Sequence, residues 1–195
     1  MIWLEAYKTN SKPALIAGYF IKAVESRTGC PKRIRADLGT ENGHMEQMQK
    51  FLRYEHLDEF ASRSFLYGSS NHNQRIEAWW SYLRSHNAQF WMSLFKGLKE
   101  EDEFTGNFLD KNLIQFCFMR LIQDELNEVV HLWNTHRMRR NQNQVAPSGR
   151  PLTMYQIPHL YGTENHACPV SLEKIRICQE ECIYKESFPC DSDVF

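Results

Sequence analysis

The sequence lacks any long apolar run, any basic leader and any large excess of charge. No stretch of its 195 residues approaches the apolar length that a transmembrane helix requires, which argues against a membrane protein. Met1 is followed directly by Ile-Trp-Leu-Glu-Ala-Tyr, without a basic segment, an apolar segment or a small-residue cleavage site, so nothing marks the chain for secretion. We therefore expect an intracellular protein, nuclear or cytoplasmic, with no membrane partner.

Several enzyme signatures are also missing. Gly39 and Gly43 do not form a phosphate-cradling P-loop, and no Ser, His and Asp arrangement has a recognisable local pattern. A phosphatase-like α/β enzyme would need its own nucleophile loop, which we do not find. A net charge of −1 does not announce a nucleic-acid binder, but the charge is unevenly distributed. Residues 99–103 are acidic, whereas residues 129–163 contain four arginines and no acid, which predicts either a phosphate-binding or a merely solvated segment.

The residues that are present predict a folded α/β domain. Hydrophobic residues make up 42% and aromatic residues 13% of the chain, which argues against disorder. Alternation of apolar residues predicts strands at 1–9, 32–37 and 63–70. Apolar spacing at three and four predicts helices between them and beyond. The expected helices cover 13–28 with Ser11 as cap, 44–57, 73–98 with a bend or break near Asn87 and a stop at Gly97, and 110–140 with Asp110 as cap.

Two carboxylates stand where such a fold places its functional crevice. Asp37 ends the strand at 32–37, and Glu77 lies early on the helix that follows the next strand. In open α/β sheets the crevice lies outside the carboxyl ends of the strands, so the two acids can converge. Mg²⁺ commonly takes one or two protein carboxylates and completes its shell with phosphate and water. The alternative is a helix cap and an ordinary surface glutamate.

The segments around these acids resemble a known family. "RADLGTENG" followed by "GSSNHNQRIEAWWSYLR" is similar to the second and third acids of the DDE integrase core of retroviral integrases and related transposases. In this sequence 39 residues separate Asp37 from Glu77, slightly more than the family's characteristic spacing. "HLWNTHRMRRNQNQ" and "GRPLTMYQIP" are similar to the end of transposon integrase cores. The resemblance covers roughly residues 1–160 and is closest to integrase cores of animal mobile elements.

The resemblance implies a ribonuclease H-like fold that performs phosphoryl transfer on DNA with two Mg²⁺ or Mn²⁺ ions. Asp37 and Glu77 would be catalytic residues and metal ligands. The DNA partners would be element ends and target, and an intact protein would be a homo-oligomer. One helical face carries Asn73, Ser81 and Arg84 beside Glu77, and we expect these residues, with Arg137, Arg139 and Arg140, to bind DNA. Ile76, Trp80 and Leu83 are expected to face the core rather than to stack on bases.

This sequence differs from the family pattern in lacking the family's first acid. That acid lies on a strand upstream of the segment that residues 1–9 match, so we expect a core truncated at its N-terminus, with an incomplete sheet followed by long helices. Glu5 lies on the wrong strand for that role. Two functions follow. One is an integrase-like polynucleotidyl transferase core that is inactive as this fragment, and the other is a catalytically silent DNA-binding or protein-interaction module.

The cysteines set the last residues apart. Four of the six cysteines, at 168, 178, 182 and 190, fall in residues 161–195, which we treat as an extension to a core at 1–160. Cys178 and Cys182 have an acceptable ligand spacing and His166 is available, but Cys168 and Cys190 lack the spacing of a ligand pair. The pattern therefore argues against zinc at these cysteines, and we expect solvated thiols on a loosely ordered extension.

Overall fold

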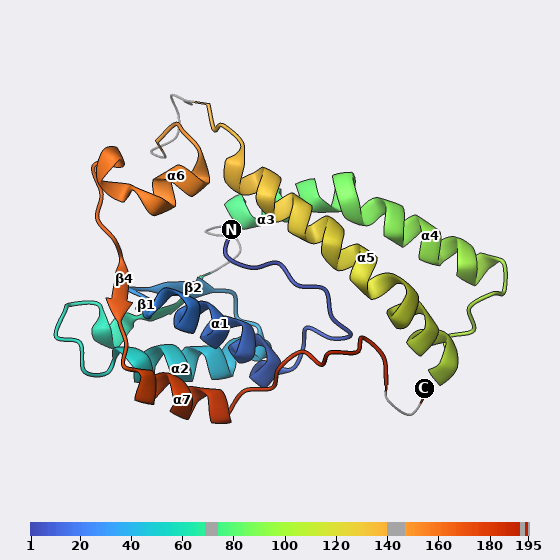
Figure 1. Ribbon diagram of the computed structural model, residues 1–195, viewed down its shortest axis with the longest axis horizontal. Coiled ribbons are helices and arrows are strands. Elements are labelled where there is room, and N and C mark those ends of the chain that lie inside the picture. The colour runs from blue at the N-terminus through green and yellow to red at the C-terminus, as the bar shows by residue number, and fades with distance from the viewer. Residues whose placement is uncertain (69–73, 140–146, 192–193, 195) are drawn as a thin grey trace.

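The computed structural model describes residues 1–68, 74–139, 147–191 and 194, which form helices and very short strands (Figure 1). Side chains of residues 74 and 75 are not described. The helices are α1 (Pro13–Arg27), α2 (Gly43–Arg53), α3 (Gln74–Leu83), α4 (Gln89–Glu100), α5 (Phe108–Thr135), α6 (Pro151–Gln156) and α7 (Leu172–Glu180). The strands are β1 (Gly29–Pro31), β2 (Ile34–Ala36), β3 (Phe65–Tyr67) and β4 (Ala167–Pro169).

The four strands make two separate sheets of two strands each. β2 and β3 are parallel, with Ile34 opposite Phe65 and Ala36 opposite Tyr67. β1 and β4 are antiparallel, with Cys30 opposite Cys168. A chain of helices with small sheets is compatible with the α/β class, and none of the described strands joins these two pairs into a larger sheet.

The strand predicted at residues 1–9 is wrong, because this segment forms no strand. It runs along α5 (Figure 1). Amide side chains of that helix form hydrogen bonds to its backbone, as a neighbouring strand would. Gln123 accepts a hydrogen bond from Ala6 N at 2.9 Å and donates one to Leu4 O at 3.0 Å. Asn134 donates to Met1 O at 2.9 Å. The apolar alternation reflects contact with α5 rather than a sheet.

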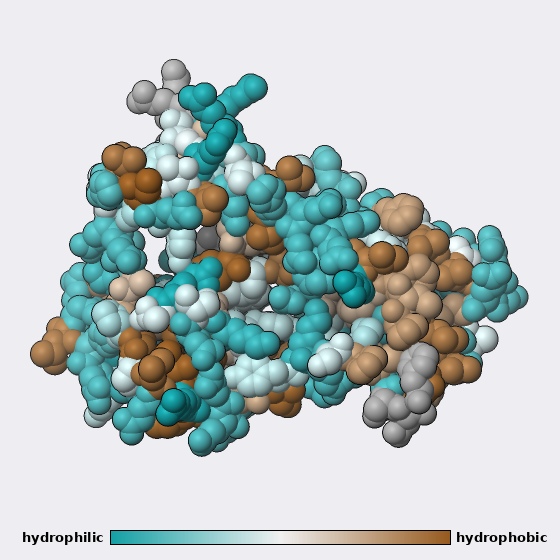
Figure 2. Space-filling model, in the orientation of Figure 1, coloured by the Kyte–Doolittle hydropathy of each residue, from teal (hydrophilic) through white to brown (hydrophobic). Residues whose placement is uncertain are grey.

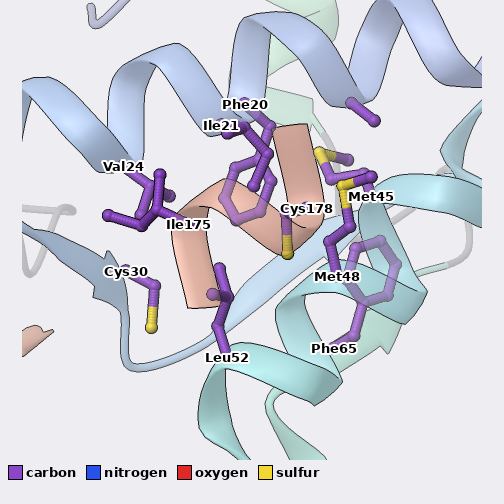
Figure 3. Packing of buried hydrophobic residues seen from close by; sticks show 11 residues of the cluster. Phe20, Ile21, Val24, Cys30, Met45, Met48, Leu52, Phe65, Ile175 and Cys178 are labelled. Atoms are coloured by element: carbon purple, nitrogen blue, oxygen red, sulfur yellow. The ribbon is translucent and has the colours of Figure 1, made fainter. Parts of the chain in front are cut away.

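The larger hydrophobic core lies between α1, α2 and α7 (Figure 3). α1 contributes Phe20, Ile21 and Val24, and its first turn begins at Pro13, whose fixed φ suits that position. α2 contributes Met45, Met48 and Leu52 from its inner face. Ile175 and Cys178 of α7 fill the space between these two helices, so residues near the end of the chain complete a core built largely from its first third.

A second, smaller cluster joins α3 to α5. Trp79 and Leu83 of α3 pack with Val129 of α5, and Met1 and Leu4 cover them. The bend or break expected near Asn87 is confirmed as an interruption of the α-helix by a π-helical turn, η4 (Arg84–Ala88), between α3 and α4. α4 then continues past Gly97 to Glu100, so the predicted stop at Gly97 is wrong. None of the described helices is both long and apolar enough to cross a membrane. Exposed hydrophobic side chains gather on the surface over α4 and α5 (Figure 2).

At α1 and α5 the N-cap is a residue close to the predicted one in the sequence. The N-cap of α1 is Lys12 without a side-chain bond, and the Ser11 hydroxyl pairs with Thr9 instead. The N-cap of α5 is Asn107, whose Oδ1 accepts a hydrogen bond from Asp110 N at 2.8 Å. Asp110 lies in the first turn and accepts bonds from the hydroxyl and N–H of Thr105. These bonds hold the pKa of Asp110 below its usual value.

The expectation of solvated thiols is wrong for two of the four late cysteines. Cys178 is 3% and Cys190 is 2% exposed, and Cys178 belongs to the core of α1, α2 and α7. Burial raises the pKa of the Cys178 thiol to about 11, because the thiolate would lose its hydration. The division of the chain at residue 160 stays a prediction, but α7 packs as part of the core.

Candidate active site

Asp37 follows β2 directly and is exposed to solvent. Because β2 and β3 are parallel, their carboxyl ends point the same way, and a bond from Gly68 N to Ala36 O at 2.9 Å closes the pair just before Asp37. The predicted position of Asp37 at a strand end is therefore confirmed. The chain then turns through η1 (Thr40–Asn42) into α2.

A buried amide holds this carboxylate in place. Asn42 is 7% exposed, and its Nδ2 donates to Asp37 Oδ1 at 2.9 Å. The same nitrogen lies 3.4 Å from Glu41 Oε1. Two carboxylates therefore gather around one amide, and Asp37 Oδ2 and the remaining lone pairs are not used by these bonds. The sequence pattern did not single out Asn42 and Glu41, although both belong to the same "DLGTEN" segment as Asp37.

Gly39 allows this arrangement. A Cβ built on Gly39 would lie 2.0 Å from Glu41 Oε1, because the glutamate side chain folds back over the glycine. Any larger residue at position 39 would push the Glu41 carboxylate away. The constraint is steric and concerns only the position of the Glu41 side chain, since the backbone conformation of Gly39 is one that other residues adopt.

Glu77 lies in the first turn of α3 and is exposed. Residues 69–73, which connect β3 to α3, lie outside the described residues, and Asn73 is among them. Ser81 is one turn further along and is exposed, and its hydroxyl donates to the Glu77 carbonyl at 3.1 Å. The approach of Asp37 and Glu77 to a shared cation stays a prediction.

The inner face of α3 differs from the predicted one. Trp79 and Leu83 are 5% and 7% exposed, whereas Ile76 and Trp80 are 47% and 50% exposed. Trp79 faces α5, where its ring lies edge-on to Trp133 with centroids 6.0 Å apart. The core assignment is thus confirmed for Leu83 and wrong for Ile76 and Trp80. The indole of Trp80 is exposed and lies three positions after Glu77, so it is accessible for stacking on a base.

The predicted DNA-binding arginines lie on two elements. Arg84 is exposed at the start of the π-helical turn η4. Arg137 and Arg139 are exposed just after α5, where an antiparallel bridge pairs Met138 with Gly149. Together with Met138 and Ser148 they line an open hollow of about 540 Å³. Arg140 lies outside the described residues.

A larger pocket of about 590 Å³ is lined in part by residues of β2. Its lining includes Ile34 and Arg35 of β2, Phe20 of α1, Trp3 of the N-terminal segment and Tyr155 of α6. Ile34 and Ala36 bond to the β3 side, through Ser64 O and Gly68 N. Alternation along the strand directs the backbone groups of Arg35 to the opposite edge. No described strand pairs with that edge.

A family model of the integrase core domain matches residues 1–167. A search of curated proteins and a search of solved structures gave no match. The matched span includes the β2–β3 pair, Asp37, Glu77 and the arginines after α5.

Proposed function

The chain belongs to the integrase core domain family, and we propose on that basis that Asp37 and Glu77 are two of the metal-binding acids of a site for phosphoryl transfer on DNA. The family consists of integrase- and transposase-like polynucleotidyl transferases, and its core implies a ribonuclease H-like fold. The single observation that supports the assignment most strongly is the parallel β2–β3 pair. Asp37 leaves the carboxyl end of one strand, and the other strand leads toward the helix that carries Glu77.

The residues around Asp37 fit a divalent cation. Integrase cores generally use such ions, and hard cations prefer anionic oxygen ligands. Asp37 is exposed and anchored through Oδ1 to Asn42, which leaves Oδ2 and unused lone pairs for Mg²⁺ or Mn²⁺. When bound, a pair of such ions activates the attacking hydroxyl and stabilises the leaving oxygen. Asn42 orients the carboxylate, and Gly39 lets Glu41 fold beside it.

The arginines supply the second part of the proposal, which is DNA binding. Arg84 follows α3, the helix that carries Glu77, and Arg137 and Arg139 line the hollow after α5. Exposed guanidinium groups bind phosphate oxygens without reading the sequence, so they would position a duplex. Trp80, half-exposed on α3, adds a surface on which an unpaired base could stack.

The first acid of the family pattern is not among the matching residues of this sequence. We propose that a strand carrying it would lie along the free edge of β2, where the backbone of Arg35 has no described strand partner and the 590 Å³ pocket provides an apolar wall. Without that carboxylate, the two ions lack a shared ligand. Residues 1–195 alone should therefore bind DNA but show little metal-dependent strand cleavage or joining.

The test is a strand-transfer assay with Mg²⁺ or Mn²⁺ on residues 1–195 and on a chain extended upstream by strands that carry an Asp. In the extended chain, Asp37→Asn and Glu77→Gln should each abolish joining with modest effects on DNA affinity, because the amide keeps the shape but loses the anionic ligand. Glu46→Gln, which removes an acid from the neighbouring α2, is the matched control and should retain activity. Activity that survives both site substitutions would remove these acids from the mechanism.

A second candidate is a catalytically silent DNA-binding or protein-interaction module on the same core. It is favoured by the presence of only two acids of the pattern in this sequence. The same assay separates the two functions. Strand transfer in the extended chain supports the enzyme, whereas DNA binding without strand transfer in both chains supports the module.

A further inference from the structure

A second group of possible metal ligands lies away from Asp37 and Glu77. His56 and Asp58 belong to the loop after α2, and Cys168 is the central residue of β4. One ligand atom from each of the three lies within 4.8 Å of the others, and all three are partly buried. This proximity joins two segments that are more than 100 positions apart in the sequence.

Local hydrogen bonds fix both sides of the group. On one side, His56 N donates to Arg53 O at 3.0 Å, and Asp58 Oδ1 accepts a bond from Phe60 N at 3.0 Å. On the other side, β4 is held against β1, and Lys32 N donates to His166 O at 2.9 Å. Hydrogen bonds therefore already fix the backbone that carries the three ligands, which lowers the entropic cost of binding an ion.

Cys30 adds a second thiol beside the group. It lies directly opposite Cys168 in the β1–β4 pair and is completely buried. It is not one of the three residues whose ligand atoms meet within 4.8 Å, so its side chain would have to move to reach a bound ion. The fourth position of a tetrahedral ion would otherwise hold water.

A buried arginine forms an ion pair with one of the three ligands. The Arg53 side chain is 0% exposed, and its Nη2 donates to Asp58 Oδ2 at 2.5 Å. Its Nε and Nη1 are also buried and have no hydrogen-bond partner. A buried guanidinium with two unused donors is costly unless negative charge lies close by. The Asp58 carboxylate supplies that charge, and its ion pair with Arg53 fixes the orientation of this ligand beside His56 and Cys168.

We propose that His56, Asp58 and Cys168 form a structural zinc site that fastens β4 to the loop after α2. One nitrogen, one oxygen and one sulfur donor suit Zn²⁺, whereas Mg²⁺ takes oxygen ligands almost exclusively. Binding releases the thiol proton of Cys168 to solvent. The site differs from the zinc arrangement that the late cysteines suggested, because Cys178 and Cys182 lie on and after α7 and contribute nothing to it.

The test uses the full chain, purified under reducing conditions with zinc and then dialysed. Elemental analysis should find about one zinc per chain, and replacement by Co²⁺ should give a thiolate-to-cobalt charge-transfer absorption in the near ultraviolet. Cys168→Ser should remove the bound metal and with it that absorption, and His56→Asn should weaken the metal affinity by more than about tenfold. Cys117→Ser, which removes an exposed cysteine of α5, is the matched control and should change neither.

Chelation of the wild-type protein keeps the test informative if a variant fails to fold. A chelator should lower the melting temperature of the wild type, and added zinc should restore it. Cys30→Ser then identifies the fourth ligand, because loss of part of the cobalt charge-transfer intensity would assign that position to Cys30 and unchanged intensity would assign it to water. Absence of bound metal in the wild type, or zinc retained in Cys168→Ser, would overturn the proposal.

Discussion

Replacing Ile175 by alanine tests whether α7 is an integral part of the core. Ile175 is 1% exposed and lies between α1 and α2, although it falls beyond residue 167, where the family match ends (Figure 3). A helix that merely rested on the surface would tolerate the substitution. A helix that completes the core would lose buried area and leave a cavity.

The expected magnitude follows from the atoms removed. Ile→Ala deletes three carbon groups at about 0.8 kcal/mol each, and incomplete collapse of the cavity adds to this, giving a total of about 3–4 kcal/mol. With a urea dependence near 2 kcal/mol per molar for a domain of this size, the unfolding midpoint should fall by about 1.5–2 M. A loss of this size is a large fraction of the stability of an ordinary domain.

Urea unfolding followed by circular dichroism measures the effect. Ile177→Ala is the matched control, because the same residue type on the same helix is 48% exposed and should cost within about 1 kcal/mol. Equal midpoints for the two variants would refute the assignment of α7 to the core and would favour a loosely attached extension.

Three further predictions concern other parts of the chain. Replacing the three arginines of segment 137–140 should reduce the slope of log DNA affinity against log salt concentration by about 2.7, because each lost phosphate contact removes about 0.9. An unchanged slope would show that these arginines are solvated and do not contact phosphate. Asn42→Ala should lower the free energy of unfolding by about 1–2 kcal/mol, because two carboxylates lose a buried donor, and urea unfolding without such a loss would contradict that role. Burial raises the pKa of the Cys178 thiol from 9.0 to about 11 on folding. The contribution of this buried thiol to the free energy of unfolding is therefore complete below pH 9.0 and is lost as the pH rises toward about 11. The stability difference between wild type and Cys178→Ala should therefore shrink in alkali, and a constant difference in pH-dependent urea unfolding would contradict this.

Local patterns were sufficient for the elements around the candidate site. The apolar spacing of residues 13–28 predicted α1 to within a residue, and the strands at β2 and β3 followed from short apolar runs bounded by turn residues. Asp37 was placed at a strand end for the same reason. The bend near Asn87 was also foreseen. These features depend on neighbours within a few positions, which a sequence shows directly.

Features set by distant partners were not predictable in this way. The three-residue strands Gly29–Pro31 and Ala167–Pro169 each end in proline and contain no β-branched residue, so only their mutual pairing reveals them. Residues 1–9 alternate like a strand but lie on α5. Apolar periodicity also does not show which of the adjacent residues Trp79 and Trp80 is buried, because contact with α5 decides which face of α3 points inward. Nothing local signals that Arg53 is buried.

The pairing of β1 with β4 has a consequence for how the protein is made. Cys30 meets Cys168 only after the intervening 137 residues have been synthesised, and α7 follows later still. At about 5–20 residues per second, a ribosome takes on the order of 10–30 s to cover that interval. During this time α1 and α2 exist without the helix that covers their apolar faces, and residues such as Leu52 and Ile21 stay open to water or to a chaperone. Nascent chains stalled before residue 167 should accordingly associate with chaperones more strongly than released full-length chains.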